Sequence, residues 1–227
     1  MIGSTQNIGD YYQGGIVFYL NGNGGGLVAA PSDLANYYRG GCGYLGTTGT
    51  LIGTGSQNTI DIVALCSTNS TGPDTAAAVI CANSTLAGYN DWFLPSLMEL
   101  KEMYLSIGQG SPLGNVGGFD DFGGNQSIYW SSSDFSNCGD DGEGWMVDFS
   151  QNGETNSSQN IHKYSVRPIR CINNDCSSLT PSAIQEHTTN KELLKVTDLL
   201  GRETKGPNQP LFYIYDDGTV EKRIVIE

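Results

Sequence analysis

Apolar residues in this chain gather in short runs that are bounded by glycine, asparagine or aspartate. Residues 16–20 and 27–30 form two such runs around the stretch "NGNGGG", whose residue types accept the positive φ angles of a tight turn. The sequence therefore predicts a β-hairpin here. Three later runs are rich in aromatic and β-branched residues and predict further antiparallel strands, at residues 127–135, 144–154 and 163–172.

Two segments between these strands have helical character. Residues 58–66 predict a short helix that begins at Asn58 or Thr59. Residues 74–88 are rich in alanine and predict a second helix, with Asp74 as its N-cap and Gly88 in the left-handed stop position.

A third helix is predicted from the stretch "GYNDWFLPSLMELKEMY" at residues 88–104. Ser96 and Glu99 have the S-x-x-E spacing of a capping box, in which each side chain satisfies a free backbone N–H. This explains Glu99 as a structural residue, and we class Asp91 and Trp92 with it. The apolar residues that follow have the spacing of one buried helix face: Leu97, Leu100, Met103, Tyr104 and Ile107.

The chain is expected to have three parts. Residues 1–172 carry the strands and helices of an α+β domain. Residues 173–190 have the composition of a linker. Residues 191–227 alternate apolar and polar positions around "YDDGTV", a hairpin turn signal, and predict a small all-β module of two or three strands.

Charge narrows the range of partners. The 227 residues carry a net charge of −13, and residues 1–175 hold five Lys and Arg against 16 Asp and Glu. Nucleic acid is disfavoured because its binding depends on positive side chains. No apolar stretch approaches the roughly 20 residues that span a bilayer. The first residues, "MIGSTQNIGD", lack the basic and apolar regions of a signal peptide.

The six cysteines indicate an oxidising compartment. None lies in a CxxC pair and the chain has only two histidines, so a structural zinc site is disfavoured. An even number of cysteines in a chain rich in Gly, Ser and Asn favours disulfides over the alternative of six buried thiols.

Catalytic patterns are weak. His162 falls in a loop and His187 in the linker, and the serines of "SSSDF" lack the G-x-S-x-G elbow of an activated nucleophile. The adjacent carboxylates in the glycine-rich loops lack the facing arrangement of a glycosidase. We therefore expect no enzyme.

The loop at residues 131–145 is the best candidate site. Its carboxylates suit Ca²⁺, a cation that takes oxygen ligands, although an ordinary solvated acidic loop is the alternative; they are Asp134, Asp140, Asp141 and Glu143. The residues expected to contact a ligand, by stacking on a sugar ring or a partner's apolar patch, are Tyr129, Trp130, Ser132, Asp134 and Trp145. The alternative for the aromatic residues is a place in the core. Arg167 and Arg170 are expected to pair with carboxylates such as Asp148 or Glu99, as structural residues.

Four stretches resemble a known domain family. "GYNDWFLPSLMELKEMY", "YWSSSDF", "GWMVDFSQNGE" and "YSVRPIRC" are similar, in this order, to the C-terminal domain of the Legionella collagen-like adhesin. The likeness spans about residues 8 to 172. It implies a C-type-lectin-like fold, two helices around a small twisted antiparallel sheet with long loops, which formylglycine-generating enzymes also use. It also implies a disulfide from Cys81 to Cys171, which leaves Cys42–Cys66 and Cys138–Cys176.

The end of the chain resembles a second family. "VTDLLGRE" and "LFYIYDDGTVEKRIVIE" are similar to the type IX secretion sorting domain of Bacteroidetes surface proteins. This implies that residues 191–227 engage the type IX secretion machinery and that the protein is extracellular or lies on the outer-membrane surface. The function expected is adhesion or recognition of a glycan or protein ligand. The alternatives are a structural surface protein and, less favoured, an enzyme related to the formylglycine-generating oxidases.

Overall fold

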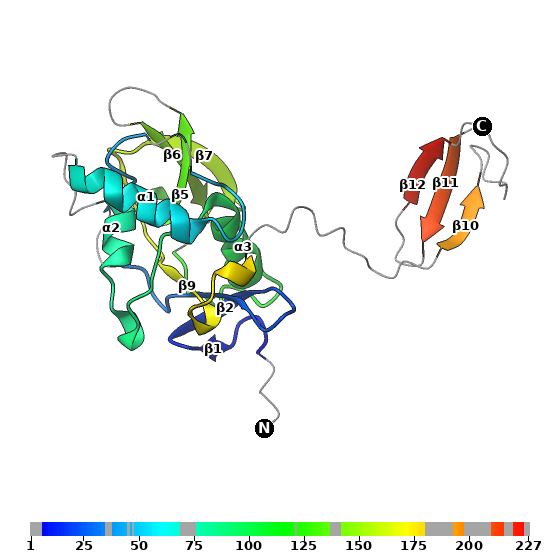
Figure 1. Cartoon of the computed structure of the whole chain (residues 1–227), viewed down its shortest axis with the longest axis horizontal. Coiled ribbons are helices and arrows are strands. Elements are labelled where there is room, and N and C mark those ends of the chain that lie inside the picture. Colours follow the sequence, from blue (N-terminus) through cyan, green and yellow to red (C-terminus); the bar gives the residue numbers. More distant parts are fainter. Residues whose placement is uncertain are drawn as a thin grey trace. The chain divides into compact units, whose positions relative to one another are not determined.

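The fold is α+β, with small antiparallel sheets and short helices (Figure 1). This computed structural model describes residues 6–34, 38–44, 46, 48–68, 76–120, 122–136, 142–179, 193–197, 210–215 and 220–224. The chain divides into two compact units, Met1–Pro181 and Ser182–Glu227.

The first sheet contains the predicted hairpin. Its strands have the order β1-β2-β3-β9, and they are β1 (Tyr11–Tyr12), β2 (Gly15–Leu20), β3 (Gly26–Ala29) and β9 (Ile169–Cys171). The Asn21 side chain accepts hydrogen bonds from the backbone N–H groups of Asn23 and Gly25, each at 2.9 Å, and so closes the turn. The hairpin prediction is confirmed. Its partner β9 comes from the far end of the unit.

The second sheet has the order β5-β6-β7, with β5 at Ile128–Ser136, β6 at Glu143–Asp148 and β7 at Glu154–Gln159. The prediction of one strand over 144–154 is wrong, because a turn separates Asp148 from Glu154. The Asp148 carboxylate builds that turn by accepting bonds from Ser150 and Gln151. The sequence missed β7, whose residues "ETNSSQ" are polar and which pairs with β6.

The predicted strand over 163–172 is also divided. β8 (Lys163–Tyr164) pairs with β4 (Tyr38–Arg39), and β9 begins after Pro168. Pro168 has no N–H to give to a ladder, and it therefore lies between the two strands.

The described residues of the first unit form the α-helices α1 (Gly55–Thr68), α2 (Ala77–Ala82) and α3 (Leu97–Ile107). The first begins earlier than predicted. The helix predicted over 74–88 ends at Ala82, and its N-cap is Ala76 without a side-chain bond, while Asp74 lies outside the described residues. The described residues also contain 3-10 turns, at Leu86–Gly88 (η2), Gly124–Gln126 (η3), Ile172–Asn174 (η4) and Ser177–Leu179 (η5).

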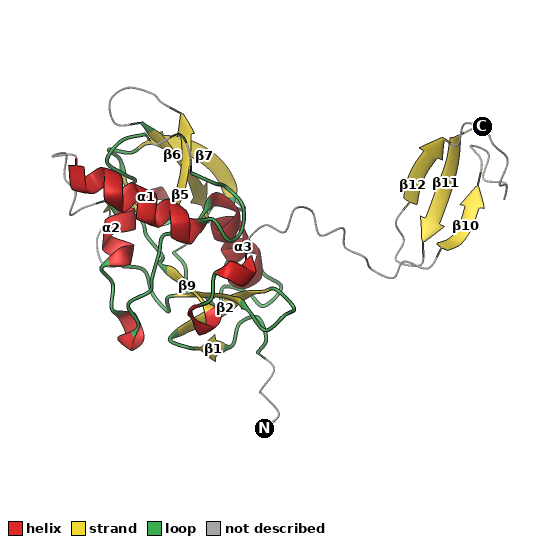
Figure 2. Cartoon of the chain, in the orientation of Figure 1, coloured by secondary structure: helices red, strands yellow, loops and turns green. Residues whose placement is uncertain are grey.

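The third helix agrees with its prediction. Ser96 accepts a bond from the Glu99 N–H at 3.4 Å and Glu99 Oε2 accepts one from the Ser96 N–H at 2.7 Å, so the capping box is confirmed. All five residues of its predicted apolar face are buried. The helix contacts β2 of one sheet and β5 and β6 of the other, and α1 contacts β5 (Figure 2). The main core therefore lies between α3 and the two sheets.

The second unit contains one antiparallel sheet, with the order β10-β11-β12. Its strands are β10 (Leu193–Thr197), β11 (Pro210–Tyr215) and β12 (Val220–Ile224). A module of two or three strands was predicted here, and three are present. In the part of the chain that the structure describes, no helix is long and apolar enough to cross a bilayer.

The disulfide pattern corrects one expectation. Cys42 and Cys66 are bonded, as expected, with a Cα–Cα distance of 5.2 Å. Cys171 is bonded to Cys176 and not to Cys81, because the 3-10 turn after β9 brings Cys176 back to a Cα–Cα distance of 5.3 Å. Cys81 is a buried free thiol, and burial raises its pKa well above the usual range. The expected Cys138–Cys176 bond is thereby excluded, and Cys138 lies outside the described residues.

Candidate functional site

An aromatic pair lies at the end of the β5–β6 hairpin. Phe135 on β5 is 46% exposed, and its ring meets the Trp145 ring edge-on with 4.6 Å between centroids. Trp145 is half-buried and also packs against the main core. The core therefore fixes the indole, and the phenyl ring remains open to solvent. We name Phe135 and Trp145 the aromatic pair.

Two carboxylates adjoin this pair. Asp134 pairs with Gly144 across the ladder, and its Oδ2 accepts a bond from the Gly46 N–H at 3.1 Å. Glu143 Oε2 accepts a bond from Ser157 at 3.3 Å. The other two residues of the expected calcium set, Asp140 and Asp141, lie outside the described residues. Among the described side chains, no three of His, Cys, Asp and Glu are grouped closely enough to hold a metal ion.

Three of the expected ligand contacts lie in the interior. Tyr129, Trp130 and Ser132 expose 0%, 1% and 1% of their surface. Tyr129 packs against Phe149, and Trp130 against Tyr164. These three residues therefore offer no surface to a ligand, and only Trp145 and Asp134 of the expected set remain at the surface.

The serines of "SSSDF" form a buried hydrogen-bond network. Ser131 donates to the Trp145 carbonyl at 2.8 Å, and Ser133 donates to the Gly49 carbonyl at 2.7 Å. Ser132 accepts a bond from the Asn58 side chain at 3.2 Å. These hydroxyls connect β5 to β6, to α1 and to the loop before α1, which is a structural role.

Glu99 is a buried carboxylate held by backbone amides. Three N–H groups, those of Gly53, Gly55 and Ser96, donate to it. A Cβ at Gly55 would lie 2.2 Å from Glu99 Oε2, so glycine is needed where α1 begins. Burial raises the pKa of Glu99 above its usual value, and the amide bonds only partly offset this. The residue joins the starts of α1 and α3, in agreement with its structural class.

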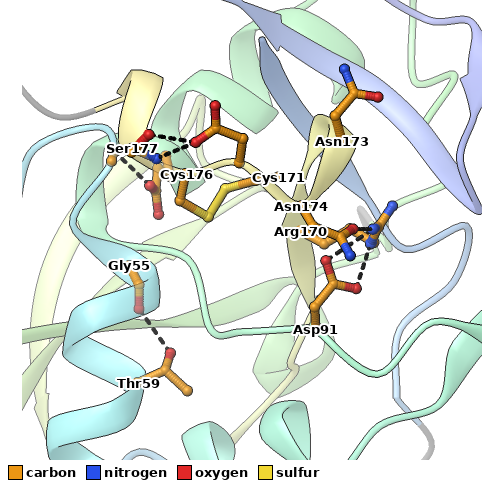
Figure 3. The surroundings of a disulfide bond; sticks show 12 residues. Gly55, Thr59, Asp91, Arg170, Cys171, Asn173, Asn174, Cys176 and Ser177 are labelled. Carbon is orange, nitrogen blue, oxygen red and sulfur yellow. Dashed lines mark hydrogen bonds and ion pairs between the residues drawn. A yellow bond between two sulfur atoms is a disulfide. The ribbon is translucent and has the colours of Figure 1, made fainter.

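The Arg170 side chain is fully buried. Its guanidinium makes two bonds to Asp91, at 2.8 and 2.9 Å, and lies 3.8 Å from the centroid of the Tyr89 ring. It also donates to the Gln13 carbonyl at 2.9 Å and to the Asn174 side chain. Asp91 is therefore the counter-ion of Arg170, and Figure 3 shows this pair together with Asn174 beside β9.

Arg167 has a different set of partners. It pairs with Asp33 at 2.5 Å and lies 4.2 Å from the centroid of the Phe119 ring. Asp33 also accepts the Tyr129 hydroxyl at 2.8 Å, and burial together with the Asp33 charge raises the pKa of that phenol. The remaining guanidinium bonds go to three backbone carbonyls, those of Ala30, Gly117 and Gly118.

The expected partners of the two arginines were therefore wrong. Asp148 is occupied by its own turn and Glu99 by backbone amides. The prediction that both arginines pair with carboxylates is confirmed. Trp92, the last of the residues classed as structural, is buried and donates from its indole to the Leu86 carbonyl at 3.1 Å.

Sequence reasoning missed a group of surface residues around Arg170. Gln13, Asn173 and Asn174 have φ angles of 46°, 59° and 58°, and no pattern in the sequence pointed to them. The one available signal was the pair "NN" directly after a strand, since asparagine is the residue that most often accepts a left-handed conformation after glycine.

A scan against models of protein families finds no match for this chain, and a search of curated proteins finds none.

Proposed function

We propose that this protein is an exported binding module that recognises a glycan or a protein surface through the loops at the end of β5 and β6. The aromatic pair carries the proposal. Phe135 is 46% exposed and is held against a tryptophan that the core fixes, so it presents a rigid apolar face. Aromatic faces of this kind stack on sugar rings and on apolar patches of partners.

The C-type-lectin-like fold is part of the same proposal. One observation supports it: the small antiparallel sheets have α1 and α3 against them. The acidic character of residues 1–175 favours neutral or basic partners over phosphate and sulfate.

An array of glycans and purified surface proteins tests the binding function with the full chain. We expect retention of at least one ligand, and loss of that retention in Phe135→Ser with unchanged thermal unfolding. Ser157→Ala, on the neighbouring strand, is the matched control and should retain binding. An array with no retained ligand would contradict the proposal.

Calcium is tested separately, by calorimetry of CaCl2 added to the chelator-treated protein. Asp134 and Glu143 lie on adjacent strands. Their carboxylates supply oxygen atoms, the ligand type that a hard cation takes. We expect binding that is weakened in Asp134→Asn. Absence of heat from both proteins would remove calcium from the proposal and leave ligand recognition in place.

We also propose that residues 191–227 form a type IX secretion sorting tail, which places the protein outside the cell or on the outer membrane. Its support is the likeness of the tail, together with the separation of Ser182–Glu227 as its own unit. Fusion of this tail to an exported reporter in a Bacteroidetes host should bring the reporter to the surface. A reporter that stays in the periplasm would contradict this.

One observation favours a structural surface protein as the second candidate. β7 is an edge strand of six residues without Pro or Lys, the residues that usually protect such edges. Light scattering that shows concentration-dependent self-association, together with an array without ligands, would favour this candidate over the first.

A further inference from the structure

We infer that a second binding site lies at the loop closed by Cys171 and Cys176, and that this site takes hydroxyl groups of a neutral saccharide. The site consists of Gln13, Asp91, Asn173 and Asn174, and we name these four residues the amide cluster. Gln13 lies in the turn between β1 and β2 and the two asparagines lie in η4 after β9, whereas the aromatic pair lies on β5 and β6, so the two sites share no residue.

Strained backbone is concentrated at this cluster. Among the described residues other than glycine, five have a positive φ, and Gln13, Asn173 and Asn174 are three of them. Gln13 and Asn173 are joined twice, since the Gln13 amide donates to Asn173 Oδ1 at 2.7 Å and Gln13 Oε1 accepts the Asn173 N–H at 2.8 Å. Residues kept in such conformations are concentrated at ligand-binding positions.

The exposed ends of the amides carry unused donors. Asn173 and Asn174 are both exposed, and their side-chain oxygens already accept bonds from Gln13 and Arg170. Among the described residues, neither NH2 group donates a hydrogen bond. Asp91 is 28% exposed, and each of its oxygens has a lone pair beyond the one given to Arg170.

The support beneath the cluster is rigid. Arg170 is 0% exposed and is held by Asp91 on one side and by the Tyr89 ring on the other. The next residue, Cys171, projects to the opposite face of β9 and forms the disulfide that closes the loop (Figure 3). Groups fixed in this way lose little conformational entropy when a ligand binds.

The chemistry of these groups selects the ligand. A hydroxyl group both donates and accepts, and amide donors next to a carboxylate acceptor match a pair of neighbouring hydroxyls. Arg170 and Asp91 neutralise each other, and the surrounding domain is acidic, so the cluster has no surplus positive charge for an anionic sugar. The ligand class is therefore a neutral saccharide.

The double variant Asn173→Gly with Asn174→Gly tests this site in the full chain. Glycine accepts the positive φ and removes the two side-chain amides, together with the bonds that their oxygens accept from Gln13 and Arg170. Asn152→Gly is the matched control, because Asn152 is an exposed asparagine with φ 55° in the β6–β7 turn. The probe is a set of neutral and sialylated or sulfated glycans, with affinity measured by calorimetry for each retained glycan.

We expect a neutral saccharide to bind, with an affinity at least tenfold weaker in the double variant and unchanged in Asn152→Gly and in Phe135→Ser. Cys171→Ser with Cys176→Ser should weaken binding as well, whereas Cys42→Ser with Cys66→Ser should not. Retention of anionic glycans alone, retention of none, or full affinity in the double variant would overturn the inference. Loss of all binding in Phe135→Ser alone would overturn it and leave the proposed function standing.

Discussion

Arg167 and Arg170 lie three residues apart in one segment. Comparison of the two distinguishes a side chain that stabilises the interior from one that supports residues of a proposed binding surface. Both are buried, both pair with an aspartate and both lie over an aromatic ring. Arg167 gives its remaining donors to backbone carbonyls, which fixes the loop at 117–118. Arg170 also bonds to the side chain of Asn174, an exposed residue. The same residue type therefore stabilises an interior in one case and supports a surface in the other.

The largest expected effect comes from removal of either guanidinium. Arg167→Ala and Arg170→Ala each leave a partly buried aspartate without its counter-ion and should lose about 3–5 kcal/mol of unfolding free energy. Urea unfolding of the two variants measures this loss. If the comparison holds, any saccharide affinity of the folded protein falls in Arg170→Ala and stays unchanged in Arg167→Ala. A loss below about 1 kcal/mol in both would show that neither ion pair organises the fold.

The two disulfides are expected to contribute unequally to stability. Cys42–Cys66 spans 24 positions and Cys171–Cys176 spans five. Since stabilisation by a cross-link grows with loop length, we expect losses of about 3.5 and about 2 kcal/mol when each pair is replaced by serine. Thermal unfolding of the two double variants measures the order. The reverse order would mean that the short loop is a major determinant of stability and does more than fix the amide cluster.

A smaller, pH-dependent effect is expected at Glu99, the buried charge that has backbone amides and no arginine as partners. Its raised pKa means that the folded state binds a proton more tightly than the unfolded state, so its contribution to stability is present at low pH and is lost as pH rises from about 4.5 through the folded pKa. Glu99→Gln should remove this pH slope and cost about 1–3 kcal/mol, because one oxygen is replaced by a donor that faces backbone N–H groups. Urea unfolding between pH 4 and pH 8 compares the two proteins. An identical slope in both would contradict this role.

The smallest effect on stability is expected at Phe135, which lies outside the core. Phe135→Ser should change the unfolding free energy by less than about 0.5 kcal/mol. Trp145→Ser, in contrast, removes a side chain that packs against the core and should destabilise the protein measurably. Calorimetric unfolding of both variants tests this difference. A large loss in Phe135→Ser would make the phenyl ring a structural residue.

The predictable parts of the fold are those set by local chemistry. The capping box of α3 depends on Ser96 and Glu99 alone, and the β2–β3 hairpin depends on a turn of glycine and asparagine. The apolar face of α3 also follows from spacing within one element. Such features need no knowledge of distant segments, and the sequence therefore predicts them correctly.

The features that the sequence did not predict correctly depend on contacts between distant segments. β7 is polar and forms only because β6 supplies its hydrogen-bond partners. Arg167 and Arg170 find aspartates 134 and 79 positions away, while the nearer carboxylate of Asp148 is consumed by its own turn. Within the candidate site, Trp145 could be predicted, whereas Gln13 and the two asparagines meet only through the tertiary fold.

The central claim is that the buried charged residues build the domain and the exposed side chains at its loops recognise the ligand. Its most direct test is the affinity of the full chain for a ligand retained on the glycan and protein array, measured for wild type, Phe135→Ser and Asn173→Gly with Asn174→Gly. We expect every retained ligand to lose at least tenfold affinity in one of the two variants, while both variants stay folded at the temperature of the measurement. A retained ligand that binds both variants with wild-type affinity would show that neither group of exposed side chains recognises it.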